Sequence, residues 1–143
     1  MQFFESLIKY NMLSQEKILI VSNILKKIPD LACAYIHGSA LTNYFREKSD
    51  IDIALLFYPG KNTMDFAEDL LGYSSDIESC TGHTAHFSQL SSYNNVFSKE
   101  VITKGQLIIC NDSYFCKTFT MHTFSMYANL NQERSKILEQ YIA

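Results

Sequence analysis

Two carboxylates stand within an otherwise apolar run near the middle of the sequence. Asp50 directly precedes the run 51–57 and Asp52 is its second residue, and a Gly38-Ser39 pair comes before Asp50 with ten residues between. In an extended segment, residues two apart share one face, and two carboxylates on one face suit a divalent cation such as Mg²⁺. A carboxylate in apolar surroundings is costly unless it meets a partner. The spacing therefore indicates metal-assisted chemistry on a phosphate-bearing substrate.

The Gly38-Ser39 pair has the residue types that a phosphate requires. Glycine allows the backbone to approach a ligand closely, and the N-terminus of a following helix offers free N–H groups to an anion. The hydroxyl of Ser39 adds a further donor. Either feature alone is most often structural, so the inference depends on the combination and on its placement on two neighbouring strands.

The elements that must position these residues follow from hydrophobic periodicity and from turn residues. The sequence predicts four strands, at 31–37, 51–57, 84–90 and 106–110. It predicts helices at 14–28, 40–46, 63–80 and 96–104, and a C-terminal helix from 112 to 141 that is either continuous or broken near Asn129. Strands that alternate with helices indicate an α/β or α+β fold with helices against one small sheet.

Composition limits the classes of function. A chain of 143 residues that is 47% apolar suits one globular domain. Its net charge of −3 gives no general attraction to nucleic acid, and no apolar run is long enough for a transmembrane helix. No secretory signal is recognised at the N-terminus. Four scattered cysteines without a CxxC pair then indicate reduced thiols and a cytoplasmic location.

The motif G-S-x10-D-x-D, within AYIHGSALTNYFREKSDIDIALLF (34–57), resembles the signature of the polymerase-β-type nucleotidyltransferase superfamily. Within it, the chain most resembles the minimal nucleotidyltransferases (MNT) that serve as antitoxins beside HEPN-domain RNases. The segment VFSKEVITKGQLIICND (96–112) and the C-terminal helix containing YANL (127–130) resemble later segments of that branch. The likeness is strong at 35–57 and looser elsewhere.

The resemblance implies a single nucleotidyltransferase domain over 1–143, with N-terminal helices over about 1–28 and a C-terminal helical segment over about 112–143. It implies a small mixed sheet flanked by helices, with ATP as substrate and Mg²⁺ as cofactor. Gly38 and Ser39 would hold the triphosphate, and Asp50 and Asp52 the metal. The implied reaction transfers AMP to a tyrosine of a HEPN toxin, with which the protein would assemble; no membrane or direct nucleic-acid partner is implied.

The family's third catalytic carboxylate has no unambiguous counterpart, because two alignments compete. In one, LLGYSSDIES (70–79) supplies Asp76; in the other, AHFSQLSSYNNVF (85–97) supplies His86. A helical stripe that includes Ile77 favours His86, as does the length required for a crossover helix. A histidine can act as a base near neutral pH, but it is a poor ligand for Mg²⁺.

Three functions are therefore compared. The first is an active adenylyltransferase that silences a HEPN toxin. The second is a catalytically weakened homologue that neutralises the toxin by binding alone. The third is a small-molecule transferase of the aminoglycoside-modifying kind, which 143 residues leave little room for. His37, where the family usually carries an aromatic residue, is expected to pack or stack rather than react.

Overall fold

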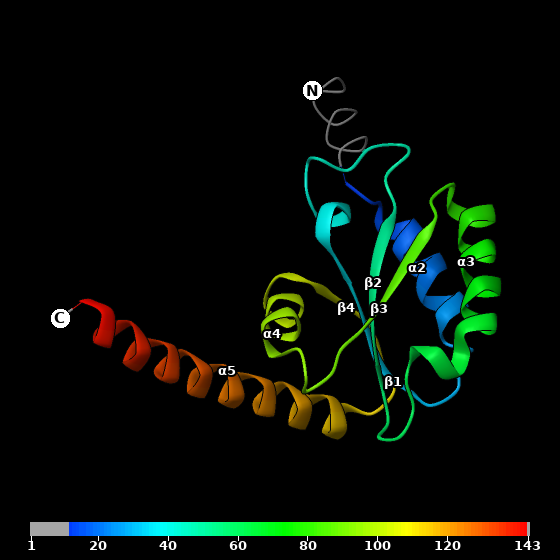
Figure 1. The fold of residues 1–143 in the computed structure, drawn as a ribbon. Helices are drawn as coiled ribbons and strands as arrows, with labels where there is room; N and C mark the ends of the chain where they lie inside the picture. The colour runs from blue at the N-terminus through cyan, green and yellow to red at the C-terminus, as the bar shows by residue number, and fades with distance from the viewer. Residues whose placement is uncertain (1–11, 143) are drawn as a thin grey trace.

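The computed structural model describes residues 12–142, in which a four-stranded mixed sheet lies between helices (Figure 1). The strands are β1 (Leu31–His37), β2 (Ile51–Phe57), β3 (Ala85–Gln89) and β4 (Gln106–Cys110), in the order β3-β2-β1-β4. β1 pairs antiparallel with β2 and with β4, whereas β2 and β3 are parallel. The parallel pair requires a crossover, which a helix between β2 and β3 provides.

Helices cover both faces of the sheet (Figure 1). They are α2 (Gln15–Leu25), α3 (Ala67–Thr81), α4 (Asn95–Lys104) and α5 (Ser113–Ile142), with short 3₁₀ turns η1 (Gly38–Leu41) and η2 (Thr63–Phe66). The side chain of Ser14 caps α2 by accepting a hydrogen bond from the backbone N–H of Lys17. Gly82, in the left-handed conformation, ends α3.

The alternation of side chains along β2 divides the core into two layers. Ile51, Ile53 and Leu55 pack in the cluster that includes residues of α2 and α3, whereas Ala54 and Leu56 pack in the cluster beneath α4 and α5. Because both faces of this central strand are covered, its sequence reads as a nearly continuous apolar run. The side chain of Asp52 follows the same alternation, so it lies on the face of α4 and α5.

α5 is one continuous helix of 30 residues, and the break considered near Asn129 does not occur. Its first turns pack on the sheet through Cys116, which is 6% exposed, and through the partly buried Phe119. Residues 131–141 are all exposed, and Figure 1 shows this part of the helix running away from the body of the protein. None of the helices in the described part of the chain combines the length and apolar character needed to cross a membrane.

Most predicted elements are confirmed, and one is wrong. The strands at 31–37, 51–57 and 106–110 have the predicted bounds, and β3 is one residue shorter at each end than predicted. The helix predicted at 40–46 is instead the single turn η1, which begins at Gly38 itself. Of the N-terminal helices expected over about 1–28, only α2 falls within the described residues, because residues 1–11 lie outside them.

The junction between α4 and β4 has no space for a side chain at Gly105. A Cβ on Gly105 would collide with the carbonyl oxygen of Val101 and lie 2.9 Å from that of Ile36. Both contacts are backbone atoms, which cannot rotate away. We expect Gly105→Ala to destabilise the fold by about 1–3 kcal/mol, as overpacking does.

The matched control is Gly72→Ala in the middle of α3, because a Cβ there meets nothing within 4 Å apart from its chain neighbours and the nearby backbone of its own helix. That substitution should stabilise the protein by up to about 1 kcal/mol through helix propensity. Urea unfolding of both variants measures the difference. Equal effects of the two substitutions would contradict the packing assigned to Gly105.

Candidate active site

A row of three polar side chains crosses one end of the sheet. Asp52 on β2 pairs with His37 on β1 and, on its other side, with His86 on β3. Directly paired residues in a sheet point to the same face, so the three side chains share the face that α4 and α5 cover elsewhere. The row lies where β1 ends and where β2 and β3 begin.

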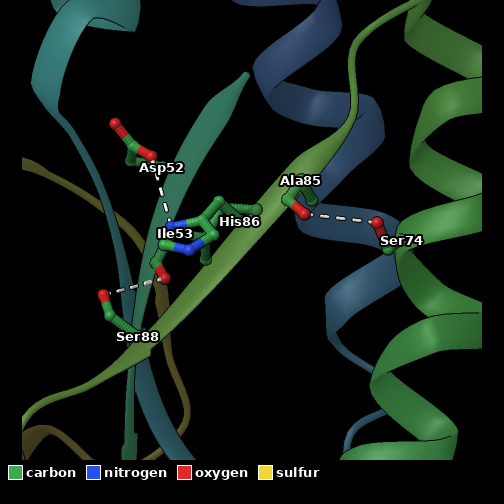
Figure 2. A network of polar contacts seen from close by, with 6 residues as sticks. All are labelled: Asp52, Ile53, Ser74, Ala85, His86 and Ser88. Atoms are coloured by element: carbon green, nitrogen blue, oxygen red, sulfur yellow. Dashed lines mark hydrogen bonds and ion pairs between the residues drawn. The ribbon is translucent and has the colours of Figure 1, made fainter.

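Asp52 and His86 lie within ion-pair distance but do not form a hydrogen bond. His86 Nδ1 lies 3.6 Å from Asp52 Oδ1 (Figure 2), which is longer than a hydrogen bond. The side chain of His86 is 73% exposed and that of Asp52 is 34% exposed. Both groups are therefore accessible to a ligand that enters from solvent.

Two serine contacts hold the backbone on either side of His86 (Figure 2). The hydroxyl of Ser74 on α3 donates to the carbonyl of Ala85 at 3.2 Å. The hydroxyl of Ser88 donates to the carbonyl of Ile53 at 3.4 Å. These contacts attach the edge strand to α3 and to β2, so the position of His86 relative to Asp52 is set by main-chain structure.

Gly38 brings the chain directly against the carboxylate of Asp52. Its φ of +74° is in the left-handed region that favours glycine. A Cβ at this position would lie only 2.6 Å from Asp52 Oδ2. The half-buried Ser39 follows within η1, and the exposed Asp50 lies in the segment that leads into β2. The structure thus brings the predicted Gly-Ser turn and the predicted aspartates to one end of the sheet.

His37, the member of this row on β1, packs against α4. It contacts Phe97 of α4 edge to face, with 5.5 Å between ring centroids, and its buried Nε2 has no hydrogen-bond partner among the described residues. Burial lowers the pKa of His37; the carboxylate of Asp52 opposes this shift and His86 adds to it. The contact with Phe97 agrees with the packing expected for His37, but Phe97 itself was not identified from the sequence.

Asp76 and His86, the two alternatives for the third position, lie in different places. Asp76 is exposed on α3, and α3 covers the opposite face of the sheet from Asp52. His86 is the direct neighbour of Asp52 on β3. The row therefore contains two histidines and one carboxylate. A second carboxylate, Asp50, precedes Asp52 by two residues.

The donor set fits a divalent cation only with help from a ligand. Within residues 12–142, no three His, Cys, Asp or Glu side chains form a group that could hold a metal ion. Asp50 and Asp52 supply carboxylate oxygens, and the Gly38 backbone lies against Asp52 with no side chain between them. Mg²⁺ is commonly held by one or two carboxylates together with substrate phosphates and water, so these residues fit it when a nucleotide is bound.

Gly38→Ala tests whether this close approach matters for binding. The new methyl group would meet a carboxylate oxygen that can rotate, so the collision displaces Asp52 rather than the backbone. We expect the left-handed conformation to cost the variant about 1–2 kcal/mol of folding stability. The free energy of nucleotide binding should fall by more than that. Urea unfolding and calorimetric titration with a nucleotide measure the two effects. Unchanged nucleotide affinity in a folded variant would contradict the role of Gly38 in binding phosphate.

His37 is expected to make stability depend on pH. Because its pKa is lower in the folded than in the unfolded chain, the unfolded chain binds more protons below about pH 6.5. The contribution of His37 to the free energy of unfolding should therefore be fully present above that pH. It should be lost as the pH falls through the folded pKa. His37→Phe keeps a ring against Phe97 and removes the titration.

Urea unfolding at pH 7.5 and at pH 5 compares the two proteins. The wild type should lose more stability than His37→Phe over this interval, since other titrating groups are common to both. An equal loss would show that burial of His37 does not govern this part of the pH dependence.

Comparison with known proteins gives one family and one structural group. The family model described as polymerase beta, nucleotidyltransferase matches residues 16–114, a range that includes Gly38, Asp52 and His86. No curated protein matches the sequence.

Several solved structures share the fold. A chain from the structure of tri-AMPylated Shewanella oneidensis HEPN toxin in complex with MNT antitoxin aligns with a TM-score of 0.63 and 25% identity, over 90% of this chain and 98% of that one. A toxin–antitoxin crystal structure with AMP-PNP gives a TM-score of 0.61 and 25% identity, over 92% and 100%. The MntA-HepT toxin–antitoxin structure, at 23% identity and a TM-score of 0.63 over 91% and 100%, supports the fold alone.

Proposed function

The chain belongs to the polymerase beta nucleotidyltransferase family, and we propose that it is an antitoxin that transfers AMP from ATP to a tyrosine of a HEPN-domain RNase toxin. The similar solved structures include an AMPylated HEPN toxin with its MNT antitoxin and a toxin–antitoxin with AMP-PNP. These relatives support both the nucleotide and the acceptor. In this proposal residues 1–143 act as one nucleotidyltransferase domain that assembles with its toxin.

One observation carries the proposal. The backbone of Gly38 lies so close to the Asp52 carboxylate that no side chain fits between them. The turn at Gly38 and Ser39 offers N–H and hydroxyl donors to phosphates, and the aspartates stand beside it. A phosphate group held by the turn is thus next to oxygen ligands for a cation.

Each residue then has a defined task. Gly38 and Ser39 bind the triphosphate and orient its α-phosphate, and Asp50 and Asp52 hold Mg²⁺. When bound, Mg²⁺ would neutralise charge on the phosphates. The tyrosine oxygen forms a bond to the α-phosphorus, the bond from that phosphorus to the β-phosphate bridging oxygen breaks, and pyrophosphate leaves.

His86 is placed to receive the proton of the acceptor. The tyrosine hydroxyl must lose a proton as its oxygen attacks, and a positioned base assists this step. The exposed imidazole of His86, 3.6 Å from the Asp52 carboxylate, is accessible to an acceptor that arrives from solvent. Asp76, on the other side of the sheet, has no role in this proposal.

A second function is favoured by one feature of the same site. The neighbour of Asp52 on β3 is a histidine instead of a carboxylate. In this proposal that residue type weakens the binding of Mg²⁺, which prefers oxygen ligands. A protein with this site could neutralise its toxin through binding alone. Activity and binding must therefore be measured separately.

Transfer of label tests the active function. The protein is incubated with α-labelled ATP, Mg²⁺ and a HEPN-domain RNase from the same genome. We expect label on the RNase, and we expect Asp52→Asn and Asp50→Asn each to lower the transfer rate by about 10²-fold or more, because each removes charge stabilisation near the reacting phosphate. Asp76→Asn is the matched control, since it removes an exposed aspartate outside the site.

The two functions give different results in this experiment. If both aspartates can be replaced without affecting silencing of the RNase, and no label is transferred by the wild type, the protein acts by binding alone. If Asp52→Asn transfers label at the wild-type rate, the proposed site is wrong.

A further inference from the structure

His86 changes the chemical character of the cation site. It stands beside Asp52 in the sheet and presents Nδ1 toward the carboxylate at 3.6 Å (Figure 2). Asp50, two residues before Asp52, is exposed in the segment that enters β2. The two side chains that lie together beside a cation are therefore one carboxylate and one imidazole.

The separation of Nδ1 and Oδ1 suits two ligands of one ion. Ligand atoms at about 2.1 Å from an ion, in adjacent positions of an octahedron, lie about 3 Å apart. Rotation of the imidazole can shorten the distance from Nδ1 to Oδ1 from 3.6 Å to this value, because the side chain of His86 is 73% exposed. Rotation of the side chain is enough, and the backbone stays in place because the contacts of Ser74 and Ser88 hold the strand on either side.

An imidazole nitrogen discriminates between cations. Mg²⁺ favours oxygen ligands, whereas imidazole suits later first-row transition ions, whose affinities for such sites rise from Mn²⁺ through Co²⁺ to Ni²⁺. A histidine in place of a carboxylate also removes one negative charge, which weakens the attraction for every divalent cation. The nitrogen offsets that loss only for ions that bind it well.

We propose that His86 shifts the selectivity of this nucleotide-dependent cation site from Mg²⁺ toward first-row transition ions such as Co²⁺. The inference rests on the proposed function, because the protein groups alone do not form a complete metal site and the nucleotide phosphates must complete it. His86 is in this respect a specificity-determining ligand.

Metal binding, rather than activity, is the readout. Wild type, His86→Ala and His86→Asp are titrated with Co²⁺ or Mg²⁺ in the presence of α,β-methylene-ATP, which cannot transfer its α-phosphate. The rise in melting temperature reports affinity, and the visible absorption of Co²⁺ reports its ligands. The preference of the nucleotide itself for either ion is common to all variants. His122→Ala, which removes an exposed histidine of α5, is the matched control.

We expect His86→Ala to lower Co²⁺ affinity by at least about tenfold, since even loss of an outer-shell partner costs about 10–100-fold. Affinity for Mg²⁺ should change by less than about twofold, because Mg²⁺ gains little from the nitrogen. His86→Asp should raise Mg²⁺ affinity and lower the ratio of Co²⁺ to Mg²⁺ affinity. The Co²⁺ spectrum should change in both His86 variants and remain unchanged in His122→Ala.

The outcomes separate this inference from the function on which it rests. An equal ratio of Co²⁺ to Mg²⁺ affinity in wild type, His86→Ala and His86→Asp, with nucleotide binding retained, overturns the inference and leaves the function standing. No binding of nucleotide with either ion overturns both. Folding of each variant is verified by circular dichroism, and the high exposure of His86 favours folded variants.

Discussion

The pairing of β1 with β2 at His37 and Asp52 is the constraint on which the site depends. It places the end of one strand against the start of the next, so the turn that follows His37 lies on the carboxylate of Asp52. The register is strongly determined, because β2 is buried on both faces and a shift of one residue would exchange its faces. Such a shift would bring Asp52 into the layer of Ile51 and Ile53, at the cost of a buried unpaired charge.

The position of Asp52 also explains how a carboxylate is tolerated in a central strand. It is the second residue of β2, at the end of the sheet where η1 begins, and it keeps 34% of its side chain exposed. Further along, Ala54 and Leu56 occupy the same face beneath α4 and α5 and are fully apolar. This face of the strand thus changes from solvent-accessible to core within two residues.

β3 supplies His86, the neighbour of Asp52 on the side away from His37. As an edge strand it is short, and its exposed side chains are less constrained by packing than those of β2. His86 therefore lies open to solvent while its backbone is held by Ser74 and Ser88. This combination of a fixed main chain and an exposed imidazole leaves His86 accessible to whatever binds beside Asp52.

The sequence by itself determined the strands, the Gly-Ser turn and the alternation that separates Asp52 from Ile51 and Ile53, since these are local properties of turn chemistry and period-two patterning. It did not determine η1, which begins at Gly38 and makes one turn instead of a longer helix, because such brief elements depend on tertiary contacts. Only the tertiary structure placed His37, Asp52 and His86 in one row, Phe97 against His37, and Asp76 on the far side of the sheet. Those neighbours are set by strand order and register, which join residues distant along the chain and leave no periodic trace in the sequence.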